Sequence, residues 1–481
     1  MTPIPSVTRP ARDCLTLNEL ERKLFGLLRE CCVRLELDVT LRVAGGWVRD
    51  KLLGLEGHDC DIAIDRMMGQ QFAERLRFFL EQHDIPSSAY GVIQANPERS
   101  KHLETATLTI FGHPIDFANL RSETYSDDSR IPIVQFGTPL QDAQRRDITI
   151  NALFYNIHTE EVEDFCGTGF ADLEEQIIRT PLPPRETLMD DPLRLLRVIR
   201  FATRFQFRTD AALERAIQDE EVDAAFRNKI SRERVGTELD KILRDKHALE
   251  GLQMMHRLRV FNLVFDLPAG VDRTNYSLPE DATIGTILRV YRRLGWSSNR
   301  RLALLCAALL PHVGEMVDRP RRMPEPLVGC IVRDSLKFTN QDVADVTQLV
   351  AQVDRVVALV ETNCQDARLL GRLVRSLGRH WLLGYELACI RHILLGGIDD
   401  ETTVHRYEAA TKRVAALGLQ DAHSWRGLLS GRDLHELLGV AQGPQIGLLI
   451  NELLDWQYEH PDGTRDEAVK HILHYSSTQN T

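Results

Sequence analysis

Two carboxylates separated by one residue are the strongest chemical signal in the sequence. Asp59 and Asp61 flank Cys60 and lead into the apolar run at 62–64, which is typical of a strand. Side chains alternate along a strand, so we expect both carboxylates on one face and Cys60 on the other. Such like charges favour cations between them, and oxygen ligands suit Mg²⁺, including a two-metal site for phosphoryl transfer. A solvated strand edge is the competing interpretation of an isolated Asp-x-Asp pattern.

A glycine pair precedes the two acids. Gly45 and Gly46 allow the backbone to approach a ligand closely, and the helix start that follows offers N–H groups to a phosphate. Arg49 would add a charge-assisted contact. A tight turn with a surface arginine is the alternative. Because the glycines, the arginine and the acid pair lie within 17 residues, the pattern favours a nucleotide site.

Further polar residues downstream are candidates for the same site. Asp116 lies within an apolar strand-like run and either faces the same metal site or occupies a strand edge. Arg145 and Arg146 precede another apolar run, and we expect them to point in different directions. One would then bind a triphosphate, while the other would pair with a structural acid such as Asp142 or Asp147. The sequence does not distinguish which arginine has which role.

A third cluster lies at a predicted helix start. Pro192 suits the first helical position and Asp191 suits its cap, so the helix is expected to begin there. Arginines follow at spacings of three or four residues and share one side of this helix: Arg194, Arg197, Arg200 and Arg204. Asp191 beside Arg194 would present an acceptor and a donor together, the complement of cytosine or adenine. A solvated basic face is the alternative interpretation.

The elements that position these residues indicate an α+β fold. Residues 17–35 have helical apolar spacing, and strands are expected at 41–44, 59–64, 105–110 and 113–120. A mixed sheet with a few helices is therefore expected over residues 28–158. After residue 184 the period is 3.6 almost to the end, which predicts helices. Residues 231–243 should form one of them, with Val235 and Leu239 on its buried side.

Composition bounds the function classes. The 481 residues carry 59 Lys+Arg and 70 Asp+Glu, a net charge of −11, which argues against a basic coat over the whole surface. Hydrophobic residues make up 43% and charged residues 27%, as in ordinary globular proteins of several domains. No uninterrupted apolar stretch is long enough to span a membrane. Nine cysteines without a Cys-x-x-Cys pair indicate neither a disulfide framework nor a zinc site.

Five ordered motifs between residues 41 and 243 are similar to those of one family. They are GGWVRDKLLGLEGHDCDIAI, RRDITINALFYN, GTGFADLEEQIIRTP, DDPLRLLRVIRFATRFQF and SRERVGTELDKIL. In this order and spacing, they resemble the class II tRNA nucleotidyltransferases, the CCA-adding enzymes, of eukaryotic type. The resemblance implies a polymerase-β-like nucleotidyltransferase head with a mixed sheet, followed by all-α neck, body and tail domains. The expected bounds are 1–27 for an N-terminal extension, 28–158 for the head, 159–245 for the neck, 246–340 for the body and 341–481 for the tail.

The resemblance also implies roles for the candidate residues. Asp59 and Asp61 would bind catalytic Mg²⁺, with Asp116 as a further catalytic acid. The incoming nucleotide and its triphosphate would contact Gly45, Gly46, Arg49, Arg145 and Arg146. The protein template that selects CTP and then ATP would consist of Asp191, Arg194, Arg197 and Arg200.

The implied activity is the addition of CCA to the 3′ end of tRNA from CTP and ATP, with release of pyrophosphate. A poly(A) polymerase or a partial enzyme that adds only CC or only A would share these motifs. An inactive tRNA-binding protein is a further alternative, although binding alone does not need a carboxylate pair on one face. We expect tRNA, CTP and ATP as partners, no membrane, and a cytoplasmic location with mitochondrial and nuclear shares.

Overall fold

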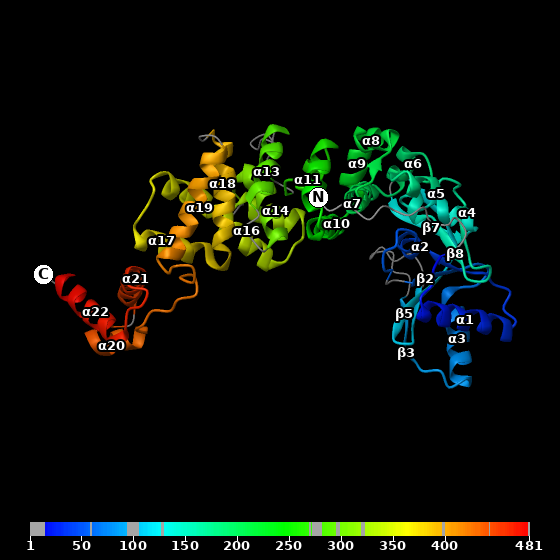
Figure 1. The fold of residues 1–481 in the computed structure, drawn as a ribbon, viewed down its shortest axis with the longest axis horizontal. Helices are drawn as coiled ribbons and strands as arrows, with labels where there is room; N and C mark the ends of the chain where they lie inside the picture. Colours follow the sequence, from blue (N-terminus) through cyan, green and yellow to red (C-terminus); the bar gives the residue numbers. More distant parts are fainter. Residues whose placement is uncertain are drawn as a thin grey trace. The chain divides into compact units, whose positions relative to one another are not determined.

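The computed structural model describes most of the chain (Figure 1). The described residues are 15–57, 60–93, 105–126, 129–268, 271, 281–294, 299–318, 323–396, 400–441 and 443–479. They fall into two compact units. The first comprises 1–241 with 257–263, and the second comprises 242–256 with 264–481.

A seven-stranded mixed sheet forms the base of the first unit. Its strand order is β3-β4-β5-β2-β1-β8-β9, with β2 and β5 parallel and the other neighbours antiparallel. The strands are β1 (Leu41–Ala44), β2 (Cys60–Ile64), β3 (Ser87–Ile93), β4 (Thr105–Ile110), β5 (His113–Asn119), β8 (Phe154–Asn156) and β9 (Glu161–Glu163). Because β1 and β2 occupy the middle, residues that follow or precede them lie near the centre of the sheet.

Three helices pack around this sheet and fix its central strands. They are α1 (Glu19–Arg34), α2 (Gly46–Leu52) and α3 (Gly69–Gln82). Phe25 of α1 lies 5.6 Å from the ring of Trp47 in α2 and 5.7 Å from the ring of Tyr155 in β8. Helix α3 begins close to β5, since a Cβ atom on Gly69 would lie 2.2 Å from the carbonyl oxygen of Phe117. This close approach fixes the strand that carries Asp116.

A hairpin and a series of helices complete the first unit. Strands β6 (Arg121–Ser126) and β7 (Ser129–Phe136) form the hairpin, and β10 (Ile177–Ile178) pairs with β11 (Arg208–Thr209). The helices are α4 (Pro139–Gln144), α5 (Gly169–Glu174), α6 (Pro184–Asp190), α7 (Arg194–Phe205), α8 (Ala211–Ile217), α9 (Glu220–Lys229) and α10 (Arg232–Arg244). Helix α7 carries most of the predicted template residues.

The second unit is mainly helical. Its longest helix, α16, packs against α18, which also contacts α13, α14 and α19. The helices are α11 (Ala248–Arg257), α13 (Asp281–Leu294), α14 (Arg300–Leu309), α15 (Leu327–Cys330), α16 (Asn340–Glu361), α17 (Ala367–Leu377), α18 (Trp381–Leu394), α19 (Asp400–Ala416), α20 (Gly431–Leu438), α21 (Pro444–Glu459) and α22 (Arg465–Gln479). The last three surround an apolar cluster of their own, centred on Leu434, Leu453 and Ile472. Across the described part of the chain, none of the helices combines the length and the apolar character that a membrane span needs.

The α+β fold class is confirmed, and several strands begin or end where the sequence predicted. Strand β1 matches the prediction at both ends, as does β4. Three details of the secondary structure differ from the expected pattern. Strand β9 extends the sheet beyond residue 158, and two short strand pairs, β10 with β11 and β12 (Met316–Val317) with β13 (Glu325–Pro326), interrupt the helices that follow. Residues 19–27, which the expected bounds place in an N-terminal extension, lie in α1, whose Phe25 contacts Tyr155 of β8; the bounds themselves stay a prediction.

Replacing Phe25 tests whether α1 is an integral part of this unit. Phe25 is 1% exposed, so Phe25→Ala should lower the free energy of unfolding by about 3 kcal/mol through lost apolar contacts and a cavity. Val33 lies on the same helix and is 77% exposed, so Val33→Ala should change it by less than about 0.5 kcal/mol. Urea unfolding followed by circular dichroism would measure both. Equal stability of the two variants would show that α1 does not support the sheet.

Candidate active site

A cavity of about 310 Å³ lies over the central strands of the first unit. Three arginines and three aspartates contribute to its wall, so both signs of charge meet in it. The lining residues are Ala44, Asp61, Ile62, Ala63, Asp116, Ala118, Asn119, Arg121, Asp142, Arg145 and Arg146. Small residues from a buried cluster, including Ala44 and Ala63, form its floor and leave the space open.

Two of the predicted acids lie side by side in this cavity. Asp61 of β2 and Asp116 of β5 are directly opposed in the parallel register. Thr107 of the neighbouring strand donates a hydrogen bond of 2.5 Å from its Oγ1 to Oδ1 of Asp116, which orients that carboxylate. Asp59, the third predicted acid, lies outside the described residues. The structure therefore brings together two of the three acids that the sequence singled out.

The donor set suits a divalent cation. Opposed carboxylates on adjacent strands repel unless a cation lies between them, and carboxylate oxygens are the ligands that Mg²⁺ prefers. Cys60 lies between the acids in sequence, and burial raises the pKa of its thiol above the ordinary value. Among the described residues, no group of three or more His, Cys, Asp or Glu side chains is arranged to hold a metal.

Gly45 is required at the end of β1 for two reasons. Its φ of +77° lies in the left-handed region, which side chains other than glycine rarely adopt. A Cβ atom there would also lie 2.6 Å from Nη1 of Arg146. Gly46 begins α2, one residue before the expected helical turn, and a Cβ on it would meet only ordinary contacts at 3.5 Å. Of the two glycines, Gly45 is therefore the one that makes room for Arg146.

Arg145 and Arg146 both turn to the same carboxylate. Nη2 of Arg145 lies 2.6 Å from Oδ1 of Asp142, and Nη2 of Arg146 lies 2.9 Å from Oδ2. Burial alone would raise the pKa of Asp142, but the two guanidinium groups hold it below its ordinary value. The prediction that the two arginines diverge was wrong. Asp142 lies three and four residues before them on the α4 turn, and this spacing places all three side chains on one face.

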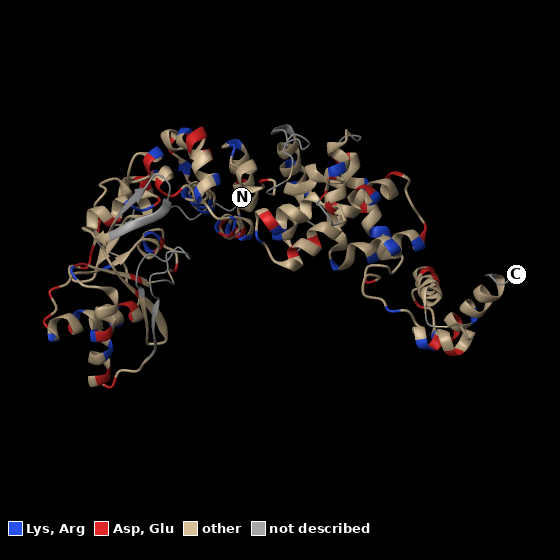
Figure 2. Ribbon diagram, turned by 180° about the vertical axis from the view of Figure 1, so that it is seen from behind, with Lys and Arg blue, Asp and Glu red and all other residues tan. Residues whose placement is uncertain are grey.

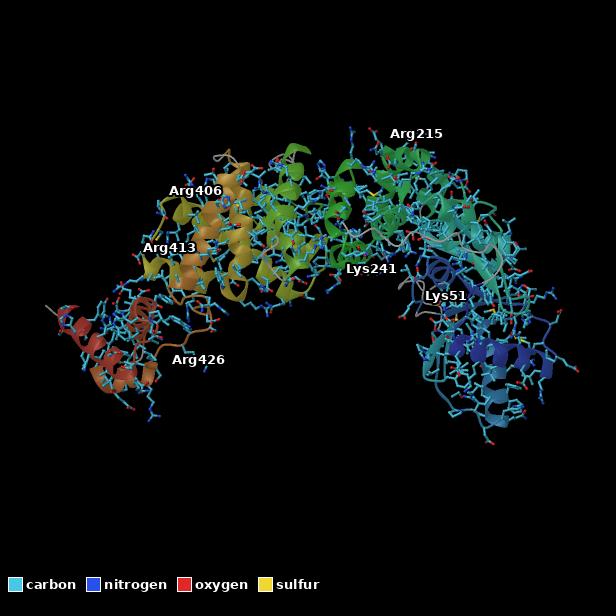
Figure 3. The ribbon with its side chains drawn as sticks, viewed as in Figure 1. Lys51, Arg215, Lys241, Arg406, Arg413 and Arg426 are labelled. Atoms are coloured by element: carbon cyan, nitrogen blue, oxygen red, sulfur yellow. The ribbon has the colours of Figure 1, made fainter. Side chains whose placement is uncertain are left out.

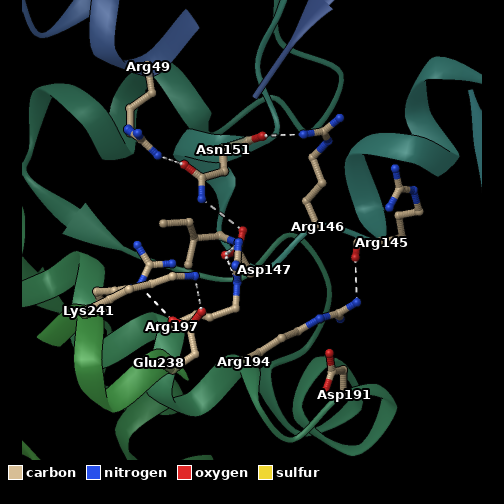
Figure 4. Close-up of polar contacts among 12 residues, drawn as sticks. Arg49, Arg145, Arg146, Asp147, Asn151, Asp191, Arg194, Arg197, Glu238 and Lys241 are labelled. Atoms are coloured by element: carbon tan, nitrogen blue, oxygen red, sulfur yellow. Dashed lines mark hydrogen bonds and ion pairs between the residues drawn. The ribbon is translucent and has the colours of Figure 1, made fainter. Parts of the chain in front are cut away.

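Arg194 connects the start of α7 to the arginine pair. The side chain is 6% exposed, and its Nη2 donates a hydrogen bond of 2.7 Å to the main-chain oxygen of Arg145 (Figure 4). Its Nη1 donates to the main-chain oxygen of Thr187 at 3.1 Å. The alternative that these arginines form a solvated basic face was therefore wrong for Arg194, the first of them. Arg204, at the other end of α7, is exposed as that alternative expected.

Asp191 pairs with an arginine from another helix. Nη2 of Arg234 in α10 lies 2.7 Å from Oδ2 of Asp191, and Nη1 lies 3.2 Å from Oδ1. The predicted helix start at Pro192 was two residues early, because the first main-chain hydrogen bonds, from Arg194 N–H to the oxygen of Asp191 and from Leu195 N–H to the oxygen of Pro192, span three residues as in a turn. Helix α7 begins at Arg194, although Asp191 still accepts a hydrogen bond from the N–H of Leu193.

A buried acid links the remaining predicted arginines. Asp147 accepts hydrogen bonds from Nδ2 of Asn151 at 3.0 Å and from Nε of Arg197 at 2.8 Å (Figure 4). Burial alone would raise its pKa, but Arg197 and Asn151 lower the pKa to about 2. Oδ1 of Asn151 in turn accepts a hydrogen bond from Arg49. Helix α10 continues the network, since Glu238 accepts from Nε of Arg200 at 2.8 Å.

Arg49 is packed inside this network and is absent from the lining of the cavity. The side chain is 4% exposed and lies over the rings of Phe201 and Phe205 in α7. Burial lowers the pKa of its guanidinium despite the neighbouring Asp50. Its predicted contact with a nucleotide stays a prediction, and in the structure Arg49 joins α2 to α7.

Some residues of this site had no assigned role in the sequence. Asn119 and Arg121 line the cavity, and Asn119 has a buried Oδ1 that finds no hydrogen-bond partner among the described residues. Asn151 and Arg234 belong to recognised motifs. Their partners, Arg49 for Asn151 and Asp191 for Arg234, lie too far away in the sequence for a spacing rule to predict the contacts. Only the position of Asp142, one helical turn before the arginine pair, carried a usable signal.

Substitution of Gly45 tests whether its backbone conformation serves Arg146. Gly45→Ala should strain the backbone and displace Arg146, which should weaken binding of a nucleoside triphosphate by about tenfold if one charge-assisted contact is lost. Gly54 is a matched control, because its φ is +70° but no atom lies within 4 Å of a Cβ built on it. Isothermal titration with CTP would compare the two variants. Equal affinities would contradict the link between Gly45 and Arg146.

Family models match two parts of the chain. Residues 41–179 match the model described as "Poly A polymerase head domain", and residues 224–269 match "Probable RNA and SrmB- binding site of polymerase A". The first region contains the cavity, and the second contains Arg234 and Glu238.

Named relatives extend the similarity over nearly the whole chain. A protein of Candida glabrata named "CCA tRNA nucleotidyltransferase, mitochondrial" is 35% identical, covering 95% of this chain and 96% of its own. A nucleotidyltransferase of Purpureocillium lilacinum, lcsQ, is 46% identical, covering 96% and 91%. A solved structure, the Thermotoga maritima CCA-adding enzyme complexed with tRNA, has the same fold at a TM-score of 0.61 and 21% identity, covering 95% of this chain and 96% of that one.

These similarities agree with the site, where opposed acids and paired arginines share one cavity on a mixed sheet. The expected family is confirmed by relatives that align from end to end, and not by the head alone. The chain belongs to the CCA tRNA nucleotidyltransferases, of the type found in yeasts.

Proposed function

We propose that this chain adds CCA to the 3′ end of tRNA, using CTP and ATP and releasing pyrophosphate. The observation that carries the proposal is the single cavity in which Asp61 and Asp116 lie with Arg145 and Arg146. Asp61 and Asp116 in the lining suit cations, and its guanidinium groups suit the oxygens of a triphosphate. Membership of the family supplies the choice of tRNA, CTP and ATP.

We propose Mg²⁺ as the cofactor, held by Asp61 and Asp59 with Asp116 as a further catalytic acid. The opposed pair Asp61 and Asp116 supports this assignment, since carboxylates in that register suit hard cations. When bound, Mg²⁺ would lower the pKa of the attacking 3′ hydroxyl and neutralise the departing pyrophosphate.

The residues of the chain would contribute positioning and fixed charge. Arg145 and Arg146 would hold the triphosphate, with Asp142 fixing the planes of both guanidinium groups. Because these groups are oriented before the nucleotide binds, little reorganisation is needed during the reaction. No protein nucleophile is required, because the attacking group is the 3′ hydroxyl of the tRNA.

Base selection would rest on Asp191 and Arg194, with Arg197 and Arg200 supporting the pocket. Arg194 is held by two main-chain oxygens, and Asp191 is held by Arg234. These contacts would fix a donor and an acceptor in place against the edge of cytosine or adenine. Uracil and guanine would present the opposite pattern.

The division into head, neck, body and tail stays a proposal, as does the cellular distribution. The name of the Candida glabrata relative assigns that protein to the mitochondrion, which supports a mitochondrial share for this chain. The cytoplasmic and nuclear shares are inferred from the sequence alone.

Product sequencing tests the function directly. The purified protein should extend a tRNA that lacks its 3′ end by CCA and stop, when all four nucleoside triphosphates and Mg²⁺ are present. A long tail of A would instead indicate the poly(A) polymerase that the head model names. Addition of only CC or only A would indicate a partial enzyme, and binding without addition would indicate an inactive tRNA-binding protein.

Substitution of the acids tests the metal assignment. Asp59→Ala or Asp61→Asn should abolish nucleotide addition and leave the dissociation constant for tRNA unchanged, because only the cation ligands are lost. Asp65, a partly buried acid just after β2, is a control: Asp65→Asn should retain addition. Primer-extension rates and filter binding would measure the two properties. Addition at the normal rate by either acid variant would refute the metal site.

Substitution of Arg194 tests base selection. Arg194→Ala should reduce the discrimination of CTP and ATP over UTP and GTP more than it weakens triphosphate binding, since the contact with the base edge is lost. Arg204→Ala, which removes the exposed arginine of the same helix, should leave discrimination unchanged. Ratios of kcat/KM for the four nucleotides would measure the effect. Unaltered discrimination in Arg194→Ala would refute the template assignment.

A further inference from the structure

A second cavity, of about 300 Å³, lies within the second unit, where α16, α17, α18 and α19 meet. We call it the α19 cavity. One wall is a single face of α19, formed by residues spaced at i, i+3, i+4 and i+7: Arg406, Ala409, Ala410 and Arg413. The two small alanines leave an open space with a guanidinium group at each end. Figure 3 labels both arginines on this helix.

The two arginines differ in how they are held. Nη1 of Arg413 donates to Oδ1 of Asn363 at 2.9 Å and to the main-chain oxygen of Cys364 at 3.0 Å, so its guanidinium is fixed in place. Arg406 is exposed, and within the described residues its side chain makes neither a hydrogen bond nor an ion pair. One cation is thus prepositioned and the other is available to close on a ligand.

The opposite wall contributes an unusual hydroxyl. Tyr385 of α18 is 1% exposed, and its buried hydroxyl has no hydrogen-bond partner among the described residues. Burial raises the pKa of this phenol, so it stays protonated and able to donate. A buried hydroxyl without a partner costs free energy, and a ligand that accepts its hydrogen bond would recover that cost.

The rest of the lining points to a ligand with more than an anionic group. Leu359, Val360 and Leu370 give the cavity an apolar surface that suits a flat ring. Glu361 also lines it, with Oε1 3.3 Å from Nε2 of His392. A carboxylate disfavours simple phosphate, but it accepts hydrogen bonds from a ribose hydroxyl or an exocyclic amine.

We propose that the α19 cavity binds one nucleoside phosphate, with the phosphate on Arg406 and Arg413 and the base against the apolar wall. The same chemistry is offered by a free mononucleotide and by one nucleotide of an RNA chain. If the ligand is a free mononucleotide, the α19 cavity is a second nucleotide site, apart from the one over the sheet. If the ligand is one nucleotide of an RNA chain, the α19 cavity is a contact for the tRNA substrate, and this case rests on the proposed function.

Photocrosslinking of the full-length chain tests the proposal with one probe for each source. The probes are 8-azido-AMP and a tRNA carrying 4-thiouridine, and mass spectrometry identifies the crosslinked peptides. We expect crosslinks to 359–370 or 406–413 with at least one probe. Arg406→Ala should weaken that probe's binding by about tenfold, as for loss of one charge-assisted contact, and Ala409→Leu should abolish it by filling the cavity.

Lys412→Ala is the matched control, because Lys412 is an exposed cation of the same helix that does not line the cavity. It should retain the crosslinks. If the source is RNA, Arg406→Ala should also raise KM for tRNA while leaving KM for CTP unchanged. Absence of crosslinks at both segments, or equal crosslinking in all three variants, would overturn the proposal. CCA addition by the unmodified chain, measured in parallel, separates this failure from failure of the proposed function.

Discussion

The site depends on holding several buried or half-buried guanidinium groups in one region of an acidic protein. A buried cation is stable only when a carboxylate or several oxygen acceptors surround it. Asp142 serves Arg145 and Arg146, and Asp147 serves Arg197. These acids have depressed pKa values, so they stay ionised through the physiological range and keep the arginines in place. These pairs shape the cavity wall and hold α7, whereas α10 is joined to the site by the pairs of Arg234 with Asp191 and of Glu238 with Arg200.

The net charge of −11 is compatible with an RNA substrate for the same reason. Net charge is a sum over the chain, whereas binding depends on the local field. Figure 2 shows acidic and basic residues interspersed along the ribbon, with neither sign covering the whole chain. Many acids near the site are already paired with arginines, as Glu238 is with Arg200 and Asp191 with Arg234. The sum therefore says little about which surface carries positive potential.

Local features of this fold were predictable, and distant pairings were not. The strand at 41–44 and the buried positions Val235 and Leu239 of α10 follow from short-range periodicity, which the sequence displays directly. The partnership of Asp191 with Arg234 spans 43 residues and depends on how α10 packs, which no spacing rule encodes. The start of α7 was placed early because the proline and cap signals do not distinguish a three-residue turn from the first turn of an α-helix, and the chain forms such a turn at residues 191–194. For Asp59, the sequence pattern remains the only basis for its assignment.

The hydrogen bond from Arg194 to Arg145 ends on a main-chain oxygen, and this has a consequence for tolerance to substitution. Every residue type supplies a carbonyl oxygen, so replacing the side chain at 145 removes the pairing with Asp142 but retains the acceptor for Arg194. The hydrogen bond between Arg194 and Arg145 thus depends on the side chain at one position and only on the main chain at the other. Substitution of Arg194 removes this hydrogen bond, whereas substitution of Arg145 leaves its main-chain acceptor in place. Sequence covariation between positions 145 and 194 would therefore underestimate this contact in chains that share the same backbone.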